Sequence, residues 1–284
     1  MNVARSVRPT LATLQAAPLP VVIGLVLIAF WIVALLTLQW WPLYEPLDMV
    51  GRRLQPPSAD HWLGTDALGR DVLSRTLHGV RYSLPIAMIV VAAAVLLGGL
   101  LGALAGFFGG IADSVIMRAV DITLAFPPIL LAMAVAASLG PGLENAAIAM
   151  IIVWWPLYAR LMRAQVLEVR EREHVEAAVA AGAGPFRVLG LHVVPLCWTP
   201  VMVNATMDFG QVVLLAASLS FIGLGATPPS PEWGAMISDG AKFFYHWWIA
   251  FGPGLAILSV VLGFNFVGDG LRDLFDPRHS GDGK

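Results

Sequence analysis

Long apolar runs recur along this chain, and they limit its fold more than any other feature. The run from Leu19 to Trp41 exceeds the roughly 20 residues that a helix needs to cross a hydrocarbon layer about 30 Å thick. Later runs are of similar character, so we predict an all-α integral membrane protein. The six expected transmembrane helices are Leu19–Trp41, Leu84–Phe108, Ala119–Leu139, Asn145–Arg160, Leu196–Ile222 and Trp248–Leu271.

Composition agrees with a membrane location, since the chain is 58% hydrophobic and only 13% charged. A net charge of −2 indicates no nucleic-acid partner. Arg5 and Arg8 precede the first apolar run, but that run exceeds the roughly 7–15 apolar residues of a signal peptide, so we interpret it as a retained span. The single cysteine, Cys197, excludes an intrachain disulfide and a cysteine metal cluster.

A polar stretch separates the fourth and fifth expected spans. Its first part, Val175 to Ala181, is alanine-rich with Glu176 near the start, which favours a helix. The sequence Gly182-Ala-Gly184-Pro185 should end that helix, because glycine accepts positive φ and proline cannot continue the hydrogen-bond ladder.

A second short helix is predicted from Phe186 to His192, before Pro195 opens the next span. It should present apolar side chains to a groove in a partner, namely Phe186, Val188 and Leu189, beside Arg187 and His192. An ordinary cytoplasmic loop with a turn is the simpler alternative.

The order Glu176-Ala177-Ala178, Gly182 and His192-Val-Val-Pro195 resembles the EAA loop of the permease subunits of ABC importers. That loop docks on the ATPase in the family, whose type I permease fold is a bundle of six transmembrane helices. The resemblance implies these ATPase-coupling residues: Glu176, Ala177, Ala178, Gly182, Gly184, Phe186, Arg187, His192 and Pro195.

The segment between the first two spans predicts an amphipathic helix along the membrane surface. Thr65 or Asp66 is the expected N-cap, and one helical face would carry Leu68, Val72, Leu73 and Leu77. The segment also resembles the opening signature of the C-type subunit in the dipeptide, oligopeptide and nickel branch of these permeases. The matching residues are Gly64-Thr65-Asp66, Gly69-Arg70-Asp71, Ser74-Arg75, Gly79 and Ser83-Leu84.

Small residues recur at intervals of four in the second span, at Gly98, Gly102, Gly106 and Gly110. Such spacing allows two helices to approach closely, so we expect these glycines to pack within the bundle or across a dimer.

The fifth span carries polar residues on one predicted helical face, namely Asn204, Asp208, Gln211 and Ser218. A carboxylate near the bilayer centre costs about 2.5–3.5 kcal/mol, so Asp208 should contact water, a cation or a partner rather than lipid. We interpret this face as bordering the translocation pathway. The equal alternative is a structural contact between Asp208 and a donor on a partner permease.

The sequence after the fifth span predicts a compact external loop, because prolines and glycines interrupt the helix. It resembles the family's order of Phe-Leu-Gly-Leu-Gly, a proline pair and Trp-Gly, with Ile222 in place of the usual leucine. The candidate external gate or binding-protein docking residues are Pro228, Pro229, Trp233 and Gly234, and a rigid lid is the alternative. The tail from Asn265 to Arg278 resembles the family's closing signature.

Enzymatic motifs are absent from the sequence. No P-loop consensus occurs, and the only lysines are Lys242 and Lys284, so this chain should not bind ATP phosphates itself. No paired histidines or nucleophile motif occur either. We therefore expect no catalytic residues, no metal ligands and no bound cofactor, with ATP and Mg used by partner ATPases.

The resemblance extends from about Asp60 to Arg278 and implies an importer of di- or oligopeptides. Its implied partners are a second homologous permease in a heterodimer, two ABC ATPase subunits, an external solute-binding protein and membrane lipid. Nickel chelates, glutathione and D-amino-acid dipeptides are alternative cargoes, and a stand-alone channel or secondary carrier is an alternative class.

The expected organisation places both termini in the cytoplasm of a bacterium, on the same side as the coupling loop. That orientation puts eleven of the 17 basic residues inside, namely Arg5, Arg8, Arg118, Arg160, Arg163, Arg170, Arg172, Arg187, Arg272, Arg278 and Lys284. The regions are a tail (1–18), the first span (19–41), an external segment (42–83), the core (84–271) with the coupling loop (161–195), and a tail (272–284).

Overall fold

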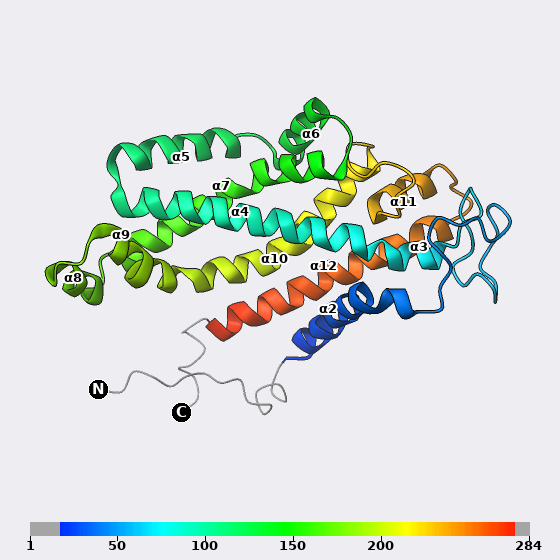
Figure 1. Cartoon of the computed structure of the whole chain (residues 1–284), viewed down its shortest axis with the longest axis horizontal. Helices are drawn as coiled ribbons and strands as arrows, with labels where there is room; N and C mark the ends of the chain where they lie inside the picture. The colour runs from blue at the N-terminus through cyan, green and yellow to red at the C-terminus, as the bar shows by residue number, and fades with distance from the viewer. Residues whose placement is uncertain (1–17, 276–284) are drawn as a thin grey trace.

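The computed structural model describes residues 18–275 and is a bundle of long helices (Figure 1). No β-strand forms in that range. The only β-type backbone pairings there are two isolated bridges, from Met49 to Arg70 and from Thr65 to Asp71. The predicted all-α membrane fold is therefore confirmed. The N-terminal region with Arg5 and Arg8, and the end of the tail with Arg278, lie outside the described residues.

Five long helices have the length and composition of membrane spans. They comprise α2 (Leu19–Thr37) with the 3-10 turn η1 (Leu38–Trp40), α3 (Val72–His78) with α4 (Val80–Phe108), α7 (Leu143–Val169), α9 (Pro185–Val188) with the π-helical turn η2 (Leu189–Val193) and α10 (Val194–Phe221), and α12 (Trp248–Phe275). The shorter helices are α5 (Gly110–Leu124), α6 (Pro128–Leu139), α8 (Glu173–Ala180) and α11 (Trp233–Ala241).

The expected third span, Ala119–Leu139, is wrong as a single straight helix. It consists of the bent pair α5 and α6, whose axes differ by 93°. Pro127 and Pro128 lie at the break, where they supply no backbone N–H donors and disfavour helix in the residues before them. The fourth span is longer than expected, since α7 continues from Leu143 to Val169 through Pro156.

The glycine stripe of α4 packs within this chain, against α7. A Cβ on Gly98 would lie 2.2 Å from the carbonyl oxygen of Trp155, and one on Gly102 would lie 2.2 Å from that of Ala159. These glycines therefore permit the backbones of the two helices to approach closely. Gly110 does not share this role, because it begins α5 and has open space around its Cβ position.

The first span packs antiparallel to the last. A Cβ on Gly24 of α2 would meet the carbonyl oxygen of Gly263 in α12 at 2.8 Å, and the indole of Trp31 donates to Ser259 Oγ at 2.8 Å. The beginning of α2 therefore lies beside the end of α12. In Figure 1, α8 and α9 lie at one end of the bundle, and α3 and α11 lie at the other.

The predicted amphipathic helix before the second span is shorter and more buried than expected. Its N-cap is Asp71, whose side chain accepts from the Ser74 N–H at 2.7 Å, and neither Thr65 nor Asp66 has that role. Asp66 instead accepts from the Leu68 and Arg70 N–H groups in a turn at Gly69, whose φ is +82°.

Charged side chains in this segment between the first two spans pair with one another inside the protein. His61 Nδ1 lies 2.9 Å from Asp71 Oδ2, and Arg70 Nε lies 2.6 Å from Asp66 Oδ2, with all four side chains nearly buried. The Gly-Thr-Asp and Gly-Arg-Asp motifs thus build a folded cap at this end of the bundle rather than a helix lying flat on a membrane surface.

Candidate functional site

A helical hairpin connects α7 to α10 at one end of the bundle. Glu173 and Glu176 lie in the first turn of α8, where carboxylates favour the positive end of the helix dipole. The helix ends at Ala180, and the turn that follows contains Gly182, whose φ of +82° is left-handed and whose N–H donates to the Val179 carbonyl at 2.9 Å. Pro185 then begins α9. The predicted first helix and glycine turn are confirmed.

The second helix of this hairpin differs from the predicted Phe186–His192 helix. Regular α9 ends at Val188, and the chain continues through the π-helical turn η2 into α10. Pro195 has no N–H for the Leu191 carbonyl, which interrupts the regular ladder at this point. The hairpin is therefore joined without a loop to a membrane-length helix.

Two of the three expected apolar contact residues do not face outward. Val188 is fully buried and Leu189 is 7% exposed, while Phe186 is 73% exposed. Val188 and Leu189 pack with Val175 in the core, and this contact holds the hairpin on the bundle. Phe186 projects from the surface, with its ring centroid 5.3 Å from that of Phe108 at the end of α4.

Other hairpin residues complete an exposed, mixed apolar and polar surface. Glu176, Ala177, Gly184 and Arg187 are exposed, as are Val179 and Leu191, which the sequence did not single out. Ala178 and His192 are partly buried, and His174 Nε2 donates to the His192 carbonyl at 3.4 Å. Their apolar character within a polar stretch is the sequence signal that could have identified Val179 and Leu191 as contact residues.

Basic residues of α7 hold the neighbouring helices at this end. Arg163 donates to both carboxylate oxygens of Asp113 in α5, at 2.5 and 2.7 Å, and Arg170 donates to the Gly106 carbonyl of α4 at 2.8 Å. Sequence reasoning used these arginines only to orient the chain. Their contacts join α7, and hence the hairpin, to α4 and α5.

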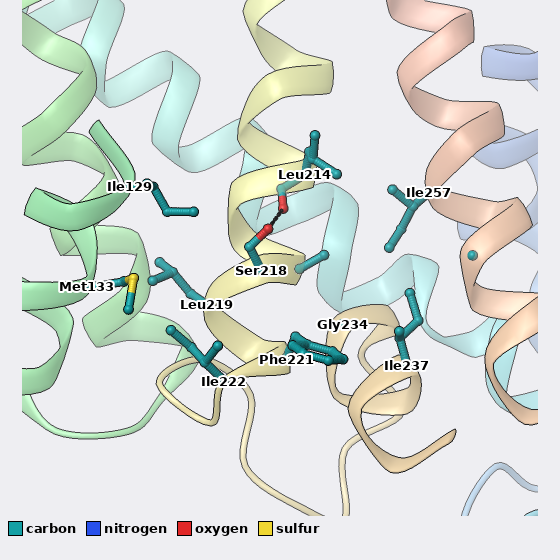
Figure 2. A pocket seen from close by; sticks show the side chains of 12 residues that line it. Ile129, Met133, Leu214, Ser218, Leu219, Phe221, Ile222, Gly234, Ile237 and Ile257 are labelled. Atoms are coloured by element: carbon teal, nitrogen blue, oxygen red, sulfur yellow. Dashed lines mark hydrogen bonds between the residues drawn. The ribbon is translucent and has the colours of Figure 1, made fainter. Parts of the chain in front are cut away.

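The polar stripe of α10 does not line one common cavity. Asn204 lines a cavity of about 620 Å³ with Arg172 and Arg272, whereas Ser218 lines a different, mostly apolar cavity of about 340 Å³ (Figure 2). Gln211 is exposed. Ser218 Oγ donates to the Leu214 carbonyl of its own helix at 2.8 Å, so it needs no other partner.

Asp208 contacts the neighbouring helix of the same chain. Its Oδ2 accepts a hydrogen bond from the hydroxyl of Tyr158 on α7 at 2.7 Å. Tyr158 is 1% exposed, so this contact is internal. A donor on a partner permease was one of two interpretations of Asp208, and the donor in this structure lies on α7 of the same chain. Tyr158 is a functional candidate that the sequence gave no reason to select.

The proposed external docking residues divide into two groups. Pro228 and Pro229 are exposed, but Trp233 is fully buried and Gly234 is also buried. The Trp233 indole donates to the Thr76 carbonyl at 2.7 Å, and a Cβ on Gly234 would lie 2.3 Å from the Ala217 carbonyl oxygen. Trp233 and Gly234 thus hold α11 against α3 and α10, and they form no docking surface.

Five helices of membrane-spanning length, one bent helix pair and an exposed hairpin between α7 and α10 define a multi-pass helical membrane protein. The sequence of residues 98–281 matches the model of the family described as "Binding-protein-dependent transport system inner membrane component". The chain belongs to this family, and the resemblance to permease subunits of ABC importers is confirmed.

Among its relatives, the chain is 44% identical to the probable D,D-dipeptide transport system permease protein DdpC of Escherichia coli (strain K12), over 94% of this chain and 90% of that protein. It is 48% identical to the dipeptide transport system permease protein DppC of Alkalihalophilus pseudofirmus, over 80% and 75%. The nickel transport system permease protein NikC of Escherichia coli (strain K12) is 41% identical, over 90% and 93%.

Proposed function

We propose that this chain is a non-catalytic permease subunit of an ATP-driven importer that carries di- or oligopeptides across the cytoplasmic membrane of a bacterium. A solute-binding protein delivers the peptide, a second permease completes the pathway, and two ATPase subunits bind and hydrolyse ATP with Mg. The names of the relatives at 44% and 48% identity support peptides as the cargo.

The observation that carries this proposal is the exposed Phe186 on a hairpin that follows α7 after a short turn and continues into α10. An aromatic side chain that is 73% exposed at a helix tip suits insertion into a groove of a soluble partner. Glu176, Gly182, Gly184, Arg187 and Pro195 shape or flank this tip. Closure of the ATPase pair would pull the hairpin and move α7 and α10 with it.

The hydrogen bond between Tyr158 and Asp208 supports such a coupled motion. It joins α7 to α10 at a partly buried position, and a hydrogen bond to a carboxylate is stronger than one between neutral groups. In this proposal the two helices move as one unit, and Asn204 lines the cavity through which solute leaves. Asp208 acts by fixing α10, and Gln211 and Ser218 lie further along the same pathway helix.

The external end receives the delivered substrate. The exposed prolines Pro228 and Pro229 are the proposed contact with the solute-binding protein, next to a cavity of about 320 Å³ that also involves Asp66 and Arg70. The buried Trp233 and Gly234 support this surface from inside.

A substitution at Phe186 tests the coupling site. Phe186→Asp should leave the chain in the membrane but abolish co-purification of the ATPase subunits and ATP-dependent peptide uptake in proteoliposomes. Phe186→Leu should retain both ATPase binding and uptake, because it keeps an apolar side chain at the tip. Tyr245→Asp is the matched control, since Tyr245 is 89% exposed at the other end of the bundle. Normal ATPase binding by Phe186→Asp would remove the proposed role.

The cargo is tested by uptake competition in the same proteoliposomes. Unlabelled dipeptides should compete with a labelled dipeptide, while glutathione and a nickel chelate should not. If glutathione or the nickel chelate competes more strongly than the dipeptides do, that compound and not a peptide is the cargo. Transport that continues without ATPase subunits would instead identify a secondary carrier.

A further inference from the structure

Two cavities lie one after the other along the groove between α2 and α4. The outer cavity, about 230 Å³, is lined by η1 at the end of the first span, by the loop after it, by the end of α3 and the start of α4, and by Pro231. The inner cavity, about 290 Å³, is lined from α2 and α4 one turn deeper, together with α10 and α12. Leu35 of the inner cavity precedes Leu38 of the outer one, and Pro85 of the inner cavity follows Tyr82 of the outer one.

The chemistry of the two cavities differs sharply. The outer cavity carries a cationic Arg81, an anionic Glu45 and the imidazole of His78. His78 Nδ1 donates to the Ser74 carbonyl at 2.8 Å, which leaves Nε2 for another partner. The inner cavity is lined by aliphatic and aromatic side chains such as Ile28, Ile32 and Phe264, and by Met88.

The outer cavity lies near the boundary between the hydrocarbon layer and water. The first span, Leu19–Trp40, has 22 residues, or roughly 33 Å at 1.5 Å per residue, so its end lies near the limit of the hydrocarbon layer. Trp41, Tyr44 and Tyr82 line the outer cavity. Aromatic side chains of this kind favour the interface between hydrocarbon and water.

We propose that the α2–α4 groove binds one phospholipid with a zwitterionic head group, of the phosphoethanolamine type. The Arg81 guanidinium holds the phosphate, for which its planar donors are suited, and Glu45 holds the ammonium group. An acyl chain fills the apolar inner cavity. With the orientation given under the proposed function, this lipid belongs to the outer leaflet.

The apolar inner cavity favours a lipid over free phosphate, although both have the same phosphate chemistry. A water-soluble phosphate would use only the outer cavity and gain nothing from Ile32 or Met88. A purely anionic head group would leave Glu45 without a counter-charge. Such a lipid would stabilise the position of α2, which meets α4 only loosely along this groove and packs mainly on α12.

Native mass spectrometry of the full chain, purified from its membranes with its accompanying subunits, tests the site. The wild type should retain one phosphatidylethanolamine per chain after detergent washing. Arg81→Gln and Glu45→Gln should each weaken retention about tenfold or more, the effect of losing a charge-assisted contact. Arg53→Gln is the control, because Arg53 is exposed in the same external segment outside the cavity.

The inner cavity is tested by filling it. Ile32→Trp should reduce retention similarly, whereas Leu36→Trp should not, since Leu36 is 64% exposed on the same helix and does not line the cavity. If thermal unfolding shows that Ile32→Trp does not fold, Met88→Trp fills the same cavity and takes its place in the test.

Three results would overturn the proposal. Equal retention by Arg81→Gln and Arg53→Gln would exclude the head-group site. Binding of soluble glycerophosphoethanolamine as tight as that of the lipid, unchanged by Ile32→Trp, would identify a free phosphate site. Equal retention of phosphatidylglycerol, unchanged by Glu45→Gln, would exclude a zwitterionic ligand.

Discussion

At the scale of single residues, Glu232 shows how this fold uses a buried carboxyl group. Its side chain is 1% exposed and caps α11, accepting from the Gly234 N–H at 3.0 Å and from the Ala235 N–H at 2.9 Å. Burial raises the pKa of Glu232 above its usual 4.5, although these hydrogen bonds act in the opposite direction. The folded protein therefore binds this proton more tightly than the unfolded chain does.

Stability should consequently depend on pH through Glu232. The contribution of the bound proton is fully present below about pH 4.5 and is lost as the pH rises through the raised folded-state pKa. Thermal unfolding should show that the wild type loses stability over this range relative to Glu232→Gln, which keeps a neutral acceptor. Glu144→Gln, at an exposed position, should follow the wild type. Parallel curves for wild type and Glu232→Gln would contradict this account.

Residue types predicted the structural roles of single residues well, but they did not predict which residues contact one another. The glycine turn at Gly182 and the need of Asp208 for a polar partner follow from conformational freedom and desolvation, which are local properties. The partner itself, Tyr158, lies 50 positions away in the chain, and no local pattern identifies it. For the same reason, the sequence could not separate Val188 and Leu189, which are buried, from Phe186, which is exposed, since all three are apolar residues of one short segment.

At the scale of elements, the contact between α4 and α7 depends on glycine at specific positions. Gly102→Ala should destabilise the protein by about 1–3 kcal/mol, because the new Cβ would lie 2.2 Å from the Ala159 carbonyl oxygen. Gly99→Ala should be almost neutral, since its Cβ would have only Met162 Cε, at 3.6 Å, as a close neighbour. Thermal unfolding of both variants in detergent compares them, and equal stability would refute the packing argument.

The hairpin between α8 and α9 depends on the left-handed turn. Gly182→Asp should leave the protein folded in the membrane but uncouple ATP hydrolysis from uptake, because a φ of +82° costs a non-glycine residue about 1–2 kcal/mol and shifts α9. Gly184→Asp adds the same charge two positions later, where φ is −66°, and should retain more uptake. Uptake assays that rank the two variants in the reverse order would indicate that charge, and not backbone geometry, matters here.

At the scale of the whole molecule, orientation in the membrane can be measured directly. The only native cysteine, Cys197, is buried, so Cys197→Ala provides a background for single-cysteine labelling. In intact cells, Tyr245→Cys should react with a membrane-impermeant reagent, while Glu176→Cys should react only after the membrane is opened. Labelling of Glu176→Cys from outside would reverse the proposed orientation and separate the hairpin from any cytoplasmic ATPase.

The sequence by itself determined the helical membrane fold, most of the spans and the hairpin. These features follow from apolar run length, from glycine and proline conformations and from backbone hydrogen bonding, all of which act over a few neighbouring residues. Pro127 and Pro128 are visible in the sequence too, but the apolar run from Ala119 to Leu139 predicted one span there.

Only the tertiary structure decided which side chains remain available to a partner. It buried Trp233 and Gly234 of α11 against α3 and α10, paired Asp208 with Tyr158, and left Phe186 exposed beside Phe108. It also aligned a polar and an apolar cavity between α2 and α4. Exposure and pairing depend on contacts between helices far apart in the chain, and periodicity along one helix does not specify which neighbour covers each face.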